Sequence, residues 1–498
     1  MLTTAEIKQF IADDTTSDKK RLAKIGQRYA EGEHDILKCR LFYYNADGNL
    51  VEDTARANIK ISHPFFLELV EQLSPYMLSF KENPIRAKKN VEGLQEQLDL
   101  YFDDEFWAEI GDLIDGAYSK GFEYIYGFKN EENRLSFQCA DSMGVVEVRE
   151  QYTDDHCKYV IYWYIDRIEK GKKAIKRIQV WSEKETAYYV QIGDGKVELD
   201  KSVKVNPRPH VITLDEEGNE MGYPLGYIPF WRLDNNKKQF SGLKPIKPLI
   251  DDYDLHACSL SNNLQDFDTP LHVVSGFQGD NLDELQTNLK TKKIVGVDSE
   301  GGIDVKTVDI PYEARKAKLE IDEKNIYKFG MGLNTYGLKD TAATTNIAIK
   351  TAYALLKMKA DKLEKRLRKL LKDIIKVVLK EINDENDKDY QLSDIEFDFS
   401  RETMVNETEN IQNAKVKAET EQLRINTLLN LVSTIDDETL VKAMCDELDF
   451  DYDEIKGKIQ KMKDEEGLQG AKDALNDIVP DDIDPIDPNG ESIITPGA

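Results

Sequence analysis

Two stretches carry residues that could bind phosphate or metal ions. GDGKVELD, residues 193–200, resembles part of the loop that cradles nucleotide phosphates. That loop also needs an earlier glycine and a hydroxyl directly after its lysine, whereas Val197 follows Lys196 here. The stretch therefore does not predict ATP hydrolysis, and we expect the energy for any movement to come from another protein.

The second stretch, DFDYDE at 449–454, has the carboxylates that calcium prefers. A calcium loop would need glycine where Glu454 stands and a carboxylate where Gln460 stands. The histidines lack metal-ligand spacing and the cysteines lack a CxxC pair. We therefore predict no catalytic residue, no cofactor and no metal site. A nuclease that uses two metal ions and dispersed Asp and Glu residues stays open as an alternative.

The composition describes an acidic chain with ample material for cores. The 498 residues include 67 Lys and Arg against 94 Asp and Glu, a net charge of −27, and 40% are hydrophobic. This charge opposes nonspecific adhesion to nucleic acid and anionic membranes. The longest apolar runs, such as YVIYWYI at 159–165, are far shorter than the roughly 20 residues of a bilayer span. We expect no membrane association, and synthesis in the cytoplasm.

Hydrophobic periodicity predicts which elements position these residues. Residues 1–130 are mostly helical by this criterion, because apolar residues recur every three or four positions. From about 135 to 232 the period changes to two, with β-branched and aromatic residues between turn sequences, which predicts an antiparallel sheet. The fold class is therefore α+β.

A helical pair with a small β insertion follows. Apolar residues on a helix ending at residue 267 are spaced alternately by four and three, which predicts one narrow seam. The seam comprises Ile246, Ile250, Tyr253, Ala257, Leu260, Leu264 and Phe267. Strand candidates lie at 271–276, 293–298 and 303–310, and a second helix runs to about Gly330. On periodicity alone the seam is an ordinary core face; packing on a neighbouring copy is the alternative.

The polar loop LNTYGLKDTAATTN, residues 333–346, interrupts two strongly helical regions. Together with Gly332 it offers flexible backbone and small hydroxyl side chains, and the charges of Lys339 and Asp340 cancel. A plain helix-to-helix connection, with Thr345 or Asn346 as the N-cap, is the local explanation.

The helix predicted after this loop, from about 347 to 382, is strongly basic. Residues 350–380 contain 11 basic and three acidic residues, a net charge of +8. This indicates either a solvated face or contact with the acidic surface of an adjacent subunit.

Five stretches of the sequence together carry a family resemblance. They are IGQRYAEGEHDIL (25–37), NIKISHPFFLELVEQLSPYMLS (58–79), GAYSKGFEYIYGFKNEENRLSFQCADSMGVVEV (116–148), IPFWRLDNN (228–236) and SGLKPIKPLIDDYDLHACSLSNNLQDF (241–267). They resemble the portal proteins of tailed bacteriophages, particularly the group typified by the portal of the Bacillus phage SPP1, and the last two are similar to the centre of that family. The resemblance covers roughly residues 20–460 in order.

The resemblance implies a mainly helical portal fold with an antiparallel β wing region, a helical stem, a small α/β clip and a helical crown, assembled as a ring. The implied parts are the wing (1–240), stem helices (241–267 and 312–331), clip (268–311), tunnel loop (332–346), long wing helix and strand (347–400), crown (401–464) and an acidic disordered tail (465–498).

The implied function is that of a noncatalytic ring of twelve subunits at one capsid vertex in the virion. It would conduct double-stranded DNA, independently of sequence, during packaging and ejection. The implied protein partners are the large terminase subunit, which supplies the ATPase, a head-completion adaptor, and the scaffolding and major capsid proteins. A metal-dependent DNA-processing enzyme and a closed scaffold without DNA passage are the alternatives.

Two groups of residues carry this implied function. The tunnel loop would contact DNA through Thr335, Gly337, Lys339, Asp340, Thr341, Thr344, Thr345 and Asn346. The clip would dock the adaptor and the terminase through Gln278, Asp280, Lys290, Lys292 and Lys293. Because every fixed cation on phosphate adds affinity, and hence a barrier to sliding, a loop of small uncharged residues suits DNA passage.

Overall fold

The computed structural model divides the chain into two compact units, Met1–Met404 and Val405–Ala498. It describes residues 1–401 except 55, 131, 152–155, 170–172, 215–219, 268–270, 278–280, 282, 284, 286–295, 307–310 and 335–345, and beyond 401 only 415–417, 419–420, 422–424, 427 and 442. The predicted crown and tail therefore lie almost entirely outside the described residues, and the first unit is the subject below.

Helices are the main element of the N-terminal region, as predicted. They are α1 (Thr4–Thr16), α2 (Asp18–Ala30), a short 3-10 helix (Asp35–Lys38), α3 (Phe65–Glu71), α4 (Leu73–Met77), α5 (Leu94–Asp99) and α6 (Asp104–Lys120). Ser17 ends α1 and caps α2 through its side chain. The periodicity did not predict the hairpin of β1 (Phe42–Tyr44) and β2 (Leu50–Glu52), whose strands are only three residues long.

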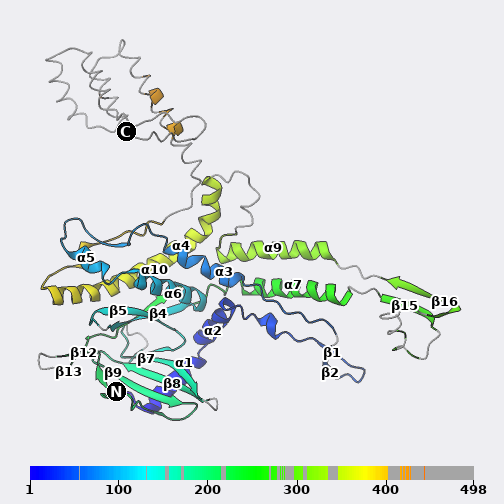
Figure 1. Cartoon of the computed structure of the whole chain (residues 1–498), viewed down its shortest axis with the longest axis horizontal. Coiled ribbons are helices and arrows are strands. Elements are labelled where there is room, and N and C mark those ends of the chain that lie inside the picture. Colours follow the sequence, from blue (N-terminus) through cyan, green and yellow to red (C-terminus); the bar gives the residue numbers. More distant parts are fainter. Residues whose placement is uncertain are drawn as a thin grey trace, which may run out of the picture. The chain divides into compact units, whose positions relative to one another are not determined.

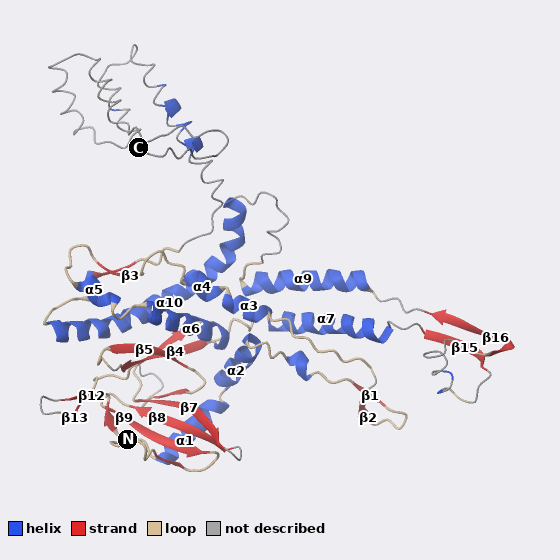
Figure 2. Ribbon diagram, in the orientation of Figure 1, coloured by secondary structure: helices blue, strands red, loops and turns tan. Residues whose placement is uncertain are grey.

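The predicted antiparallel region is confirmed and forms two main sheets (Figure 2). One has the order β10-β9-β8-β7-β6, with β11 paired to β9; the other has the order β14-β4-β5. Their strands are β4 (Phe122–Lys129), β5 (Leu135–Ala140), β6 (Val145–Val148), β7 (Tyr159–Glu169), β8 (Lys173–Trp181), β9 (Glu185–Ile192), β10 (Val197–Leu199), β11 (Arg208–Pro209) and β14 (Phe230–Asp234).

Three further strand pairs are antiparallel. They are β12 (Val211–Leu214) with β13 (Glu220–Tyr223), β15 (Leu271–Phe277) with β16 (Val297–Lys306), and β3 (Ile85–Ala87) with β17 (Ile395–Phe397), which follows a 3-10 turn (Leu392–Asp394). Residues 297–298 and 303–306 of the two strand candidates at 293–298 and 303–310 belong to the single strand β16.

The largest core lies between the helices and the three-stranded sheet. It joins buried residues of α3, α4 and α6 to Leu233 of β14 and to one face of the long helix α10 (Asn346–Asn386). On α10 the residues Leu356, Ala360, Leu363 and Leu367 follow one another at spacings of four, three and four, and all of them are buried. A smaller core packs Ile7 and Ile11 of α1 against the six-stranded sheet.

The helical pair consists of α7 (Lys247–Phe267) and α9 (Tyr312–Gly330), which pack against each other (Figure 1). Between them the chain forms the β15–β16 hairpin, so the predicted β insertion between two helices is confirmed. Within the described residues, no helix is both long and apolar enough to cross a membrane.

Candidate functional site

The chain enters the predicted tunnel loop from a closely packed base at the end of α9. Met331 ends the helix in the left-handed conformation, at φ 53° and ψ 42°, and the N–H of Gly332 donates to the carbonyl of Tyr327 at 2.9 Å. A Cβ on Gly332 would lie 2.0 Å from Leu69 Cδ2, and one on Gly330 would lie 2.6 Å from Leu69 Cδ1. A side chain in place of Gly332 would therefore have to displace Leu69 of α3, so the close packing favours glycine at this position.

Gln72, which lies between α3 and α4, holds the backbone at the start of the loop. The N–H of Leu333 donates to Gln72 Oε1 at 2.9 Å, and Gln72 Nε2 donates to the carbonyl of Leu333, also at 2.9 Å. One side-chain amide thus satisfies both backbone groups of Leu333. Because an unpaired buried backbone group costs about 1–3 kcal/mol, this pair fixes where the loop begins.

Lys359 of α10 reaches the same base from the other side of the loop. Its Nζ lies 3.3 Å from the carbonyl oxygen of Gly330 and 3.4 Å from the hydroxyl of Tyr118, and it stands 4.4 Å from the centre of the Tyr118 ring. Burial lowers the pKa of Lys359 to about 7. A lysine at the carbonyl end of a helix interacts favourably with the helix dipole when charged, so this contact ties α9 to α10.

An extended segment, residues 57–63, runs antiparallel along α7 and bonds to every fourth residue of the helix. The N–H groups of alternate residues each meet one side chain: Ala57 meets Asp266 at 2.9 Å, Ile59 meets Asn262 at 2.6 Å, Ile61 meets Cys258 at 3.2 Å, and His63 meets Asp254 at 3.0 Å. Two residues of extended chain advance about 6.7 Å and four residues of helix about 6 Å, so the two repeats nearly match. We call residues 57–63 the strap.

The strap ends at a buried carboxylate. Asp254 Oδ2 lies 2.6 Å from Nδ1 of His34, and Asp254 Oδ1 lies 2.8 Å from Nδ1 of His63. Burial acts to raise the pKa of Asp254, but the hydrogen bonds from both histidines outweigh it and hold the pKa below its usual value. This group joins the 3-10 helix region, the strap and α7.

Ion pairs complete the attachment of the two helices. Lys318 of α9 bonds to Asp252 of α7 and to Asp322 of its own helix. Lys247 at the start of α7 bonds to Asp35 at 2.7 Å and to Asp251 at 2.6 Å. Charged contacts as well as apolar packing thus hold α7 to α9, and hold α7 to the N-terminal region.

The predicted seam on α7 is only partly buried in the single chain. Ile246 and Ile250 are buried, Tyr253 and Leu260 are half-buried, and Leu264 is 53% exposed; the side chain of Phe267 is outside the described set. The fully buried positions nearer the tip are instead Asp254 and Cys258, which meet the strap. The regular polar series Asp254, Cys258, Asn262 and Asp266 was the sequence signal for this face.

Asn346 is the first residue of α10, but its side chain and the other seven predicted tunnel-loop contact residues lie outside the described part of the chain, as do all five predicted clip residues. Sequence reasoning missed Gln72 and Lys359, and no local pattern marks either residue, because their partners lie far away in the sequence.

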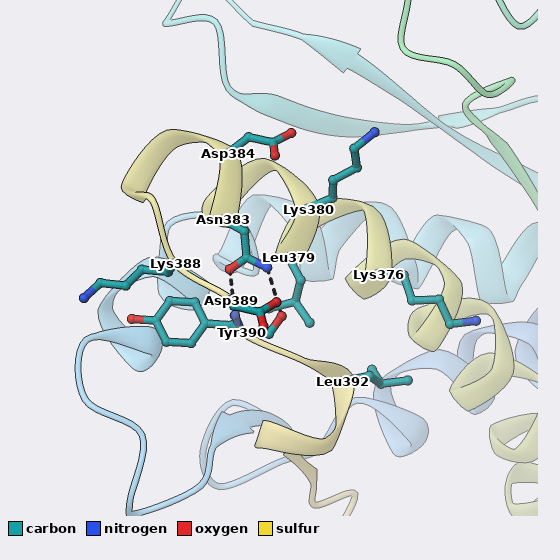
Figure 3. A pocket seen from close by; sticks show the side chains of 9 residues that line it. All are labelled: Lys376, Leu379, Lys380, Asn383, Asp384, Lys388, Asp389, Tyr390 and Leu392. Atoms are coloured by element: carbon teal, nitrogen blue, oxygen red, sulfur yellow. Dashed lines mark hydrogen bonds between the residues drawn. The ribbon is translucent and has the colours of Figure 1, made fainter.

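Two hollows lined by described residues offer alternative sites. Figure 3 shows the larger, of about 410 Å³, where Asn383 at the end of α10 bonds to the backbone N–H and carbonyl of Tyr390 at 2.8 and 2.9 Å. The other, of about 320 Å³, places Arg177 between Asp166 and Asp200. Among the described residues, no group of three or more His, Cys, Asp or Glu is arranged to hold a metal ion.

Comparison with known proteins agrees with the resemblance in the sequence. The model of the family "Phage portal protein, SPP1 Gp6-like" matches residues 8–467. The portal protein of Bacillus phage SPP1 is 27% identical over 344 residues, which cover 69% of this chain and 66% of that protein, just under two thirds of its length. The portal protein of Clostridium phage phiCD119 is 25% identical over 374 residues, which cover 70% of this chain and 77% of that protein. The chain belongs to the SPP1 Gp6-like family of phage portal proteins.

Proposed function

We propose that this chain assembles into a ring of twelve subunits at one capsid vertex and conducts double-stranded DNA during genome packaging and ejection. The family match over residues 8–467 carries this proposal. The ring would act without catalysis of its own, and the large terminase subunit would supply ATP hydrolysis. This portal function places the protein in the virion.

The described helices and strands correspond to the stem, clip and wing that a portal subunit needs. In the proposed ring, α7 and α9 form the stem and the β15–β16 hairpin belongs to the clip, residues 268–311, which docks the terminase and the head-completion adaptor. The wing comprises residues 1–240 together with α10 and β17, and residues 401–464 form the crown. Scaffolding and major capsid proteins would meet the outer surface.

The tunnel loop, residues 332–346, would face the DNA. Its base is fixed by Gln72 and Lys359, whereas its sequence offers small hydroxyl side chains and one cancelling charge pair. Contacts of this kind to phosphates are weak and independent of base sequence. A fixed base with a weakly binding loop would let DNA slide while the ring keeps its shape.

A deletion tests this assignment. Removing residues 338–344 is expected to leave ring assembly intact, because the base contacts of Gly330 and Leu333 remain, but to impair DNA packaging or retention. A variant with a Gly/Ser segment of equal length in the same place is the matched control and should package DNA. Normal packaging and retention in the deletion variant would refute the tunnel-loop assignment.

A further inference from the structure

The outer face of α10 carries a regular line of lysines. Six exposed lysines follow one another at spacings of three or four residues: Lys362, Lys365, Lys369, Lys372, Lys376 and Lys380. These spacings keep them on one side of the helix over about 27 Å. The intervening Leu363, Leu367 and Ile374 are buried in the main core. We call the six residues the lysine stripe.

The stripe is nearly without counter-charges in the single chain. Among the described residues, Lys376 pairs with Asp373 at 2.9 Å, and Lys362, Lys365, Lys369 and Lys380 have no ion-pair partner. The other two acids of this region are used by arginines: Asp361 by Arg401 at 2.7 Å, and Glu364 by Arg368 at 2.7 Å and also by Arg401. The positive charge of the stripe is therefore available to a partner.

A second segment of the same chain has the opposite character. Residues 92–112, which span α5 and the first half of α6, contain eight acids and no lysine or arginine, a net charge of −8. Seven of these acids are exposed: Glu92, Glu96, Asp99, Asp103, Asp104, Glu105 and Asp112. None forms an ion pair within the described part of the chain. We call residues 92–112 the acidic segment.

We propose that the lysine stripe of one copy docks on the acidic segment of the next copy. This inference rests on the proposed ring. Subunits of a ring meet through two different surfaces of each copy, and the stripe and the acidic segment are two such surfaces that do not pair within one chain. Because salt screens exposed charges beyond roughly 8–10 Å, only direct contact would offset the repulsion among copies that each carry −27.

A DNA duplex is the competing partner for the stripe. It would neutralise the lysines, but it would leave the −8 segment without a partner and bring a polyanion to a strongly acidic chain. A second copy accounts for both features at once. The charge complementarity therefore favours the neighbouring subunit.

Charge reversal tests the contact. The stripe variant carries Lys365→Glu, Lys369→Glu and Lys372→Glu; the segment variant carries Glu96→Lys, Glu105→Lys and Asp112→Lys, which spares Asp103, the cap of α6. The matched control reverses three exposed lysines of the six-stranded sheet region, Lys184→Glu, Lys196→Glu and Lys201→Glu. Ring content is measured by native mass spectrometry and sedimentation, and folding by circular dichroism and thermal melting.

Each interface variant alone should lose most of its rings, whereas the control should assemble. Mixing the two interface variants in equal amounts should restore rings. If the two variants alternate around the ring, each acidic stripe meets a basic segment and each basic stripe meets an acidic segment. A ring of twelve subunits allows this strict alternation because twelve is an even number. The chain that carries all six substitutions should also assemble by itself.

Three results would overturn the inference. The first is a stripe variant that forms rings as well as the unaltered chain. The second is folded interface variants that do not rescue each other. The third is a stripe variant that keeps its rings but loses binding to a DNA duplex in fluorescence anisotropy, which would assign the stripe to DNA. If the unaltered chain forms no ring, the proposed function itself fails, and this inference fails with it.

Discussion

At the scale of single residues, the base of the tunnel loop depends on groups brought together from far apart. Gln72 and Leu333 are separated by 261 residues, and Lys359 lies 29 residues after Gly330. Periodicity and turn chemistry report local structure, so they predicted the loop and its flanking helices but not these contacts. The close approach of Leu69 of α3 to Gly332 was missed for the same reason, because the two residues lie far apart in the sequence.

Lys359 provides a pH-dependent test of this base. Its pKa falls to about 7 in the folded chain, from 10.5 for an ordinary lysine, because it is buried. The unfolded chain then binds more protons than the folded one between pH 7 and 10.5, so this lysine makes stability rise with pH over that range, by at most about 1.4 kcal/mol per pH unit. Below pH 7 both states are protonated and this dependence disappears.

The expected result is that Lys359→Met flattens the rise in unfolding midpoint between pH 7 and 9. Urea unfolding of both chains at several pH values measures this, with Lys362→Met, an exposed neighbour on α10, as the control. Parallel pH profiles for the unaltered chain and Lys359→Met would contradict the burial of an uncharged amine at this position.

At the scale of elements, the helices were the most predictable part of the molecule. The seam spacing predicted α7, a helix was expected at about 347–382 where α10 lies, and the strand pattern with its turns predicted the antiparallel sheets. The β1–β2 hairpin was missed because three-residue strands are too short to show alternation. The strap was missed because its bonding pattern combines an extended chain at 57–63 with polar positions on α7, which start about 190 residues later.

Asn262 tests whether the strap is a real part of the stem. Asn262→Leu removes the acceptor for the N–H of Ile59, at 2.6 Å, and leaves that group unpaired at a cost of about 1–3 kcal/mol. Hydrogen exchange of a peptide that covers 57–63 should then accelerate about tenfold or more. Gln265→Leu is the control, because Gln265 is exposed on the same helix and has no side-chain hydrogen bond within the described region. Equal exchange in both variants would refute the strap contact.

At the scale of the whole molecule, family membership indicates the function of the chain, and the distribution of charge indicates how its copies could meet. The order of several resembling segments identified the family from sequence, and the family model covers residues 8–467. The sequence did not predict the positions of the clip and tunnel-loop contact side chains. These residues are mostly polar, and they lack the apolar periodicity from which a buried face can be predicted. Copies that each carry a net charge of −27 repel one another, and the strongly basic helix α10 is the element that could offset this repulsion where two copies meet.

The mass and rotational symmetry of the purified full-length chain, from native mass spectrometry and negative-stain class averages, test the proposed ring most directly. We expect closed rings of twelve subunits with a central hole. A monomer or dimer that persists across salt concentrations, and in the presence of a scaffolding protein, would contradict the proposed conduit. Magnesium-dependent cutting of DNA by that species would then favour the nuclease alternative.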